Sequence, residues 1–223
     1  YTNRDYEPYA RHRDGALNKL FESKGVVFNH YKDHVILEAK EVLKDDGLPY
    51  TVFTPYSRKW KAKLQAADLE SRGSADLFTS ERLHPTAPLP LPTLEALGFA
   101  PTTIDFPKEA VSDALIKVYD EQRNFPGIRG TSRLGVHLRF GTVSIRHLAR
   151  TARNHANAGS QVWLNELFWR DFYFQILHHN PQVAAGKTFK TELEHLAFPN
   201  NVTLFKAWCE GKTGYPLIDA AMR

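Results

Sequence analysis

The sequence has little cysteine and methionine and no long apolar segment. Its 223 residues include one cysteine, Cys209, and one methionine, Met222. A single cysteine excludes an intrachain disulfide framework and metal sites built on paired cysteines. No stretch approaches the roughly 20 apolar residues of a membrane-spanning helix, and the first residues hold no apolar signal core. We therefore expect a soluble intracellular protein that has no contact with a membrane.

The chain also lacks an initiating methionine and a capped C-terminal helix. It begins at Tyr1, and residues 216–223 begin as a helix with Pro216 near the first turn, then stop without a capping residue. These two features predict a piece of a longer protein, truncated at both ends.

Aromatic residues, in contrast, are well represented. Phe, Trp and Tyr make up 12% of the chain and hydrophobic residues 42%, which is ample for a buried core. Large rings suit dense packing, and they also suit flat ligands that stack. The formal net charge of +4 is compatible with a face that binds phosphate, although most such imbalances are solvated surface.

Hydrophobic patterning divides the chain into three parts. Residues 1–72 combine an amphipathic helix over 1–24, ended by Gly25, with short apolar runs typical of strands or extended edges. This part is interpreted as the end of an α/β unit. Repeated prolines make 73–107 an interdomain connector, whose leucines we expect to pack against the protein. Residues 108–223 are mainly helical. The expected strands are 26–28, 35–37 and 50–53, and the expected helices 108–122, 143–156, 161–180, 202–210 and 216–223.

The segment 161–180 places charge and aromatic rings on one helix face. At about 100° per residue, Trp163, Glu166, Trp169, Arg170 and Tyr173 share roughly a third of the circumference. One interpretation is a surface ion pair between Glu166 and Arg170 with the rings packed beside it. The other is a pocket wall, in which the rings stack on a nucleobase, the carboxylate accepts a ring N–H and the arginine binds phosphate.

Two glycine-containing segments are weaker candidates. Thr131 or Ser132 could cap a helix whose free N–H groups and positive dipole end bind phosphate, with Arg133 adding charge, but Thr-Ser before a helix is usually just an ordinary cap. Gly211-Lys212-Thr213 is not a P-loop, because Lys206 stands where the motif needs a glycine and no strand precedes it. A tight helix–turn–helix is expected there.

Together these segments resemble the photolyase/cryptochrome family, and most closely its repair enzymes for cyclobutane pyrimidine dimers. The matching motifs span nearly the whole chain in the family's order. They are Tyr6-Glu7-Pro8-Tyr9-Ala10, Val52-Phe53-Thr54-Pro55-Tyr56, Tyr119-x-x-x-Arg123-x-Phe125-Pro126, Gly130-Thr131-Ser132-x-Leu134, Phe140-Gly141-x-x-Ser144-x-Arg146, Trp163-Leu164-Asn165-Glu166-Leu167-x-Trp169-Arg170-Asp171-Phe172-Tyr173 and Trp208-x-x-Gly211-x-Thr213-Gly214-Tyr215-Pro216.

The resemblance implies a fold and a function. The fold is the end of a Rossmann-like α/β antenna domain (1–72), a connector (73–107) and the first half of a mainly α-helical FAD-binding domain (108–223). The function is light-driven dimer repair, by electron transfer from reduced FAD to a lesion flipped into the flavin pocket. A cryptochrome-type photoreceptor is the alternative. The implied partner is DNA containing pyrimidine dimers, and we expect an inactive fragment, monomeric, of a cytoplasmic or nucleoid protein.

The resemblance also assigns residues. Glu166 and Trp169 correspond to catalytic positions that hydrogen-bond a thymine and stack on the dimer. DNA contacts are implied for Arg123, Glu166, Trp169, Arg170 and Tyr173. FAD contacts are implied for Tyr119, Thr131, Ser132, Arg133, Leu134 and Gly135, and no metal is implied. A second antenna chromophore of unspecified identity is expected, and Ala10 and Ala185, where folate-binding relatives carry Glu and Lys, argue against folate.

Overall fold

The computed structural model describes residues 1–71, 87 and 89–222. They divide into two compact units, Tyr1–Pro181 and Gln182–Arg223. Within the expected connector, residues 73–86 and 88 lie outside the described residues, whereas 87 and 89–107 form turns and irregular backbone. The side chains of Leu89 and Leu91 are 85% and 92% exposed, so the expectation that these leucines pack against the protein is wrong.

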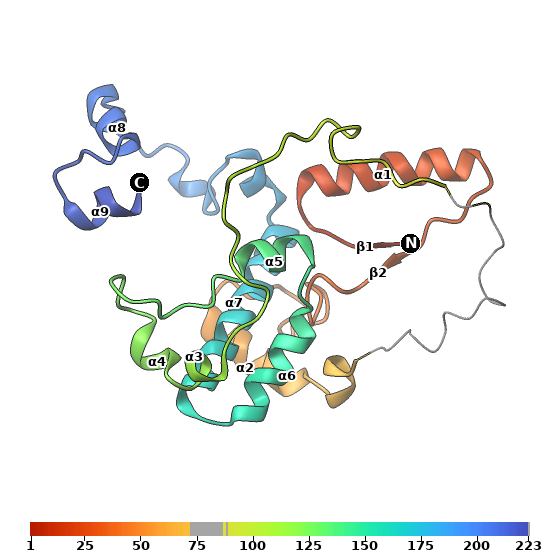
Figure 1. The fold of residues 1–223 in the computed structure, drawn as a ribbon, viewed down its shortest axis with the longest axis horizontal. Helices are drawn as coiled ribbons and strands as arrows, with labels where there is room; N and C mark the ends of the chain where they lie inside the picture. Colours follow the sequence, from red (N-terminus) through yellow and green to blue (C-terminus); the bar gives the residue numbers. More distant parts are fainter. Residues whose placement is uncertain (72–86, 88, 223) are drawn as a thin grey trace. The chain divides into compact units, whose positions relative to one another are not determined.

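The beginning of the chain forms a small parallel α/β unit. Strand β1 (Thr2–Asn3) pairs in parallel with β2 (His30–Tyr31), and helix α1 (Pro8–Ser23) connects them (Figure 1). Parallel neighbours need such a crossover, because a tight turn cannot join them. Gly25 follows α1 with φ +68°, the left-handed conformation that glycine adopts without strain. The α/β character and the end of this helix are therefore as the sequence predicts.

The three segments expected as strands adopt other structures. Residues 26–28 have no regular structure, and Phe53 begins helix α2 (Phe53–Lys63). Residues 35–37 are buried bends, whose apolar side chains belong to the core. Two of their backbone amides bind a carboxylate from a distant helix, which takes the place of a neighbouring strand. Short apolar runs indicate burial, but they do not identify the hydrogen-bond partner.

Helix α7 (Ala158–His179) is the centre of the helical part of Tyr1–Pro181. Four helices pack on it, namely α2, α3 (Asp113–Lys117), α4 (Tyr119–Gln122) and α6 (Ile145–His155) (Figure 1). Asn157 begins α7 with a capping box, accepting the N–H of Ser160 at 2.8 Å. The helices expected over 143–156 and 161–180 are confirmed. The one expected over 108–122 is two short helices separated at Val118. Helix α2 was not predicted, and α5 (Gly135–Phe140) was considered only as a helix that Thr131 or Ser132 would cap.

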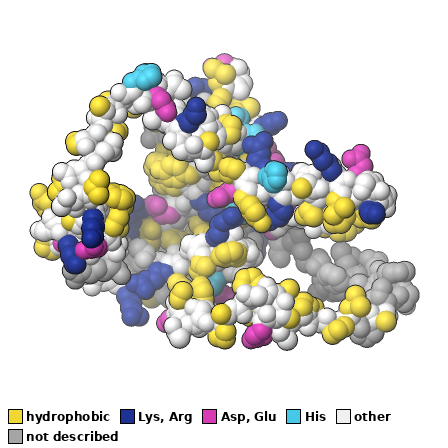
Figure 2. Space-filling model, turned by 90° about the horizontal axis from the view of Figure 1, so that it is seen from above, with side chains coloured by type: hydrophobic (Ala, Val, Ile, Leu, Met, Phe, Trp, Pro, Cys, Tyr) yellow, Lys and Arg dark blue, Asp and Glu magenta, His cyan; other side chains and the backbone are white. Residues whose placement is uncertain are grey.

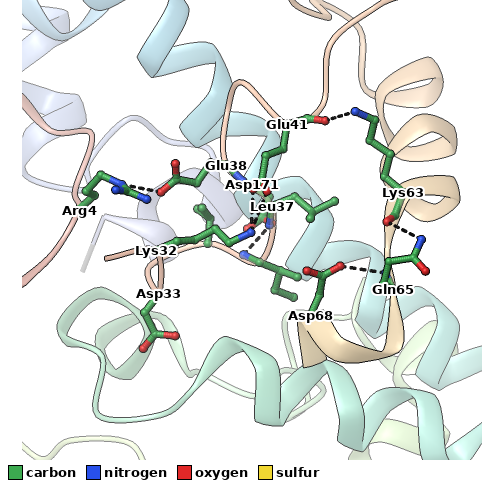
Figure 3. Close-up of polar contacts among 12 residues, drawn as sticks. Arg4, Lys32, Asp33, Leu37, Glu38, Glu41, Lys63, Gln65, Asp68 and Asp171 are labelled. Carbon is green, nitrogen blue, oxygen red and sulfur yellow. Dashed lines mark hydrogen bonds and ion pairs between the residues drawn. The ribbon is translucent and has the colours of Figure 1, made fainter. Parts of the chain in front are cut away.

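A buried carboxylate joins α7 to two other segments. Asp171 is 1% exposed, and its Oδ2 accepts the N–H groups of Ile36 and Leu37 at 3.1 and 3.2 Å. The same oxygen accepts Nε1–H of Trp60, on α2, at 3.2 Å. In Figure 3 the Asp171 side chain points toward Leu37. Burial raises the pKa of Asp171 to about 6. This one side chain therefore holds both residues 35–37 and α2 on α7.

The unit Gln182–Arg223 contains the 3-10 turn η4 (Thr191–Leu193) and the helices α8 (Val202–Cys209) and α9 (Pro216–Ala221). The preceding 3-10 turn, η3, spans Pro181–Ala185. The expected helix–turn–helix is confirmed. Asp219 on α9 accepts the N–H and the hydroxyl of Thr213, at 2.7 and 2.6 Å, and so ties the turn to the second helix.

The surface mixes apolar and charged side chains. On the face drawn in Figure 2, Lys and Arg are interspersed with Asp, Glu and hydrophobic side chains, so the net positive charge does not gather in one patch there. In the part of the chain that the structure describes, no helix combines the length and the apolar character needed to cross a membrane.

Candidate functional site

Three aromatic rings from two helices stack at the middle of α7. The indole of Trp169 is half-buried and lies against Phe53, the first residue of α2, with the ring centroids 3.6 Å apart. Tyr173, one turn along α7, lies 5.6 Å from Trp169 on the same measure and is 63% exposed. The start of α2 reaches α7 because Tyr56 packs on Phe172 in the core behind it. The stack is thus a partly exposed π-surface supported by two helices that pack on each other.

An ion pair lies one helical turn before Trp169. The Glu166 carboxylate, on α7, accepts a hydrogen bond from Nη1 of Arg123, the residue that ends α4, and each side chain is about one-third exposed. The Arg123 guanidinium also lies 5.7 Å from the ring centroid of Tyr119. Burial and the nearby Glu166 raise the pKa of Tyr119, which Arg123 partly offsets. These three residues form a cluster of a cation, an anion and a phenol between α4 and α7.

The loop after α4 contacts the end of that helix closely. Gly130 is buried, and a Cβ on it would lie 2.6 Å from the backbone oxygen of Gln122. Any larger residue would therefore push the loop away from α4. Leu134, 3% exposed, anchors the other end of the loop in the core.

Within this loop the expected helix cap is wrong. Helix α5 begins at Gly135 with Leu134 as its N-cap, and no side chain accepts its first N–H groups, so neither Thr131 nor Ser132 is a capping residue. Thr131 and Arg133 are exposed, and Ser132 is half-buried. Arg133 has φ +54°. Exposed hydroxyl and guanidinium groups suit an anionic ligand, which is what the phosphate arm of a dinucleotide cofactor would present.

Arg170 and Trp163 point away from this cluster. Arg170 donates to the backbone oxygens of His34 and Leu138 and lies 4.7 Å from the ring centroid of Phe174. Its burial lowers the pKa of the guanidinium. Trp163 is 2% exposed and belongs to the core. The five residues of the predicted helix face therefore do not form one site. Among the described residues, the ion pair predicted as one interpretation, Glu166 with Arg170, is absent, and Glu166 pairs with Arg123 instead.

The sequence did not indicate the role of Phe53. Phe53 appeared there only as one residue of the Val52-Phe53-Thr54-Pro55-Tyr56 motif, and residues 50–53 were expected to form a strand. The partner of Glu166 was also missed, because Arg123 lies 43 residues earlier in the sequence. Both contacts depend on how α2 and α4 pack against α7.

A cavity of about 630 Å³ lies elsewhere in Tyr1–Pro181. It is lined by α1, residues 38–40 and His178, and its lining includes the cations Arg4 and Arg11 and the carboxylates Asp14 and Glu38. It contains neither Glu166 nor Trp169. The candidate site is therefore a surface of α7 and α4 rather than this cavity.

Two family models match the chain. The model described as DNA photolyase covers residues 1–74, and the one described as FAD binding domain of DNA photolyase covers residues 163–223. The first lies on the α/β unit and α2, and the second begins in α7 and includes Glu166 and Trp169.

Curated relatives match over the whole chain. A deoxyribodipyrimidine photo-lyase of Synechococcus sp. is 33% identical over 244 aligned residues, which cover 100% of this chain and 50% of that protein. The protein of the same name from Escherichia coli is 31% identical, with 100% and 49% covered. The chain thus spans about half the length of these relatives.

Solved structures show the same fold. A class III photolyase from Agrobacterium tumefaciens superposes with a TM-score of 0.72 at 24% identity, covering 100% of this chain and 50% of that one. A cryptochrome from Synechocystis superposes with a TM-score of 0.65 at 18% identity, with the same coverage. The architecture, the two family models and the collinear relatives agree, and the chain belongs to the photolyase/cryptochrome family.

Proposed function

We propose that the protein containing this chain repairs cyclobutane pyrimidine dimers in DNA, using light and reduced FAD. The observation that carries the proposal is the arrangement of Glu166, Trp169 and Arg123 on one surface of α7 and α4. A π-surface, a carboxylate and a guanidinium are the groups needed to stack on a base, accept a ring N–H and bind a phosphate. The names of the curated relatives support the same activity.

Each exposed group has a role in this proposal. Trp169 stacks on a dimer flipped out of the duplex, with Tyr173 extending the stack, and Glu166 accepts a hydrogen bond from a thymine N–H. Arg123 binds the DNA backbone. A dimer stacks poorly in duplex DNA, which lowers the free-energy cost of flipping it. Arg170, expected from the sequence to contact DNA, instead contributes by holding the backbone of His34 and Leu138 against α7, since its donors face inward.

FAD is the proposed cofactor. The exposed side chains of Thr131 and Arg133, with Ser132, would hold its phosphates, while Tyr119, Leu134 and Gly135 would support that loop beside α4. When bound, reduced FAD supplies the light-driven electron that splits the dimer. A second chromophore belongs to the proposal without an assigned identity. An archaeal photolyase structure from Sulfolobus tokodaii, 26% identical to this chain, is described as containing two FAD molecules.

The test compares DNA with and without one thymine dimer. Affinities of the full chain, and of the full-length gene product, are measured for both DNAs, and dimer loss is followed under light. Replacing Trp169→Ala should reduce the preference for damaged DNA by about 1–3 kcal/mol, the free energy of one base–aromatic stack. Phe140→Ala is the matched control, because that ring is 76% exposed and lies on α5. Flavin binding with a light response but no loss of dimer would instead favour the cryptochrome-type photoreceptor.

A further inference from the structure

Arg123 is proposed to bind the DNA backbone, and in the structure it also pairs with Glu166. Its Nη1 donates to Glu166. In the described part of the chain, the Nε and Nη2 donors of the same guanidinium have no hydrogen-bond partner. A guanidinium is a planar fork that can bind anions on more than one edge at once. One edge of Arg123 is therefore occupied by the carboxylate, and the remaining donors are available to a second anion.

The position of Arg123 is set by its surroundings. At the end of α4, its backbone N–H donates to the backbone oxygen of Tyr119 at 3.0 Å. Its guanidinium lies over the ring of the same tyrosine, which is buried. Gly130 presses the following loop against Gln122, the residue before Arg123. The guanidinium is thus presented from the end of a helix.

Helix α7 fixes the backbone of Glu166 but does not by itself fix the orientation of its side chain. It lies three residues before Trp169 on α7, and its side chain is about one-third exposed. An exposed glutamate samples several rotamers, and ordering it costs conformational entropy each time a ligand binds. Solvent-exposed ion pairs contribute at most about 1 kcal/mol to folding stability, and water also screens this pair, because about a third of each side chain is exposed. The consequence of the pair with Arg123 is therefore orientation of the carboxylate, with little effect on stability.

We propose that Arg123 is a positioning residue that holds Glu166 toward a base on Trp169 while its free edge binds a DNA phosphate. This inference rests on the proposed function and deepens it, because one guanidinium then couples the DNA backbone contact to recognition of the lesion. The guanidinium, placed by Tyr119 and the end of α4, orients the carboxylate with one edge and binds the phosphate with the other. Loss of the fork geometry should affect lesion recognition even where the positive charge is kept.

The decisive variant is Arg123→Lys, which keeps the charge and removes the fork. Binding of dimer-containing and undamaged DNA is measured for the full-length gene product, and for its Arg123→Lys, Glu166→Gln and double variants. We expect Arg123→Lys to reduce the preference for damaged DNA about tenfold, the scale of one charge-assisted hydrogen bond, with affinity for undamaged DNA little changed. Arg129→Lys, on the exposed loop after α4, is the matched control.

Non-additivity separates positioning from independent contacts. If Arg123 acts through Glu166, the double variant discriminates as poorly as Glu166→Gln alone. Independent, additive losses would overturn the inference and leave the proposed function intact. If the unmodified full-length protein shows no preference for damaged DNA, the proposed function itself fails.

A second measurement tests the pair without DNA. Tyr119 titrates beside both charges, and its phenol can be followed by NMR of labelled tyrosine. The pKa of Tyr119 should rise further in Arg123→Gln, because the cation lowers it, and should fall in Glu166→Gln, because the anion raises it. A Tyr119 pKa that is unchanged in both variants would show that the pair does not form in solution, and would overturn the inference independently of any DNA.

Discussion

Phe53 and Trp169 lie face to face, with their ring centroids 3.6 Å apart and their planes inclined by only 8°. The two rings come from α2 and α7, 116 positions apart in the numbering, and the stack joins the helices at the surface where Trp169 is half exposed. One face of the indole is therefore covered within the protein. A base that stacks on Trp169 meets a ring whose orientation is already set.

Replacing Phe53→Leu should test this arrangement. The variant keeps an apolar side chain and loses the ring–ring contact, so we expect a loss of about 1 kcal/mol in the free energy of unfolding. The measurement is urea denaturation followed by tryptophan fluorescence. Phe140→Leu, whose ring is 76% exposed, should change stability little. Equal effects of the two variants would contradict a stabilising stack.

Gly130 should tolerate no side chain. In Gly130→Ala the new Cβ would lie 2.6 Å from the backbone oxygen of Gln122, so the loop or the end of α4 must move. Overpacking of this kind costs about 1–3 kcal/mol. Gly127→Ala is the matched control on the same loop, because its Cβ would meet nothing within 4 Å. The two variants are compared by denaturant unfolding, and a stability of Gly130→Ala equal to that of Gly127→Ala would show that the close contact is absent.

Asp171 should make stability depend on pH in a defined direction. Its pKa is raised from 3.8 to about 6 by burial, so the folded state binds the proton more tightly than the unfolded state. The stabilisation is complete below pH 3.8 and is lost as pH rises through about 6. A shift of this size corresponds to about 3 kcal/mol. Asp171→Asn cannot titrate, so its stability relative to the unmodified chain should improve by up to that amount between pH 3 and pH 7. A pH-independent difference would contradict the raised pKa.

Trp60 should be coupled to the same carboxylate. Its Nε1 donates to Asp171 at 3.2 Å, and both side chains are buried. Trp60→Phe removes this donor, and we expect a cost of about 1–3 kcal/mol at neutral pH in addition to the loss of packing. In the Asp171→Asn background, Trp60→Phe should cost less, because the side chain that loses its hydrogen-bond donor is no longer charged. A double-mutant cycle measures the difference, and strict additivity would exclude the coupling.

Local patterns in the sequence determined much of this protein. The spacing of apolar residues predicted α1, α6, α7, α8 and α9, because helical periodicity is a property of neighbouring residues. The collinear motifs identified the family, which the family models and relatives confirm. They also singled out Glu166 and Trp169 as candidate site residues, whose roles in DNA recognition stay predictions.

Contacts between distant segments were decided only by the tertiary structure. The helix face that groups Trp163, Glu166, Trp169, Arg170 and Tyr173 is a single surface in projection, yet α4 and residues 33–37 bind different parts of it. Arg170 turns toward His34, and Glu166 toward Arg123. Likewise residues 35–37 looked like a strand, but the nearest acceptor for their amides is Asp171, some 135 positions later. Which partner a polar group finds depends on the packing of whole elements, because a hydrogen bond requires atoms within about 3 Å and sequence periodicity carries no such distance.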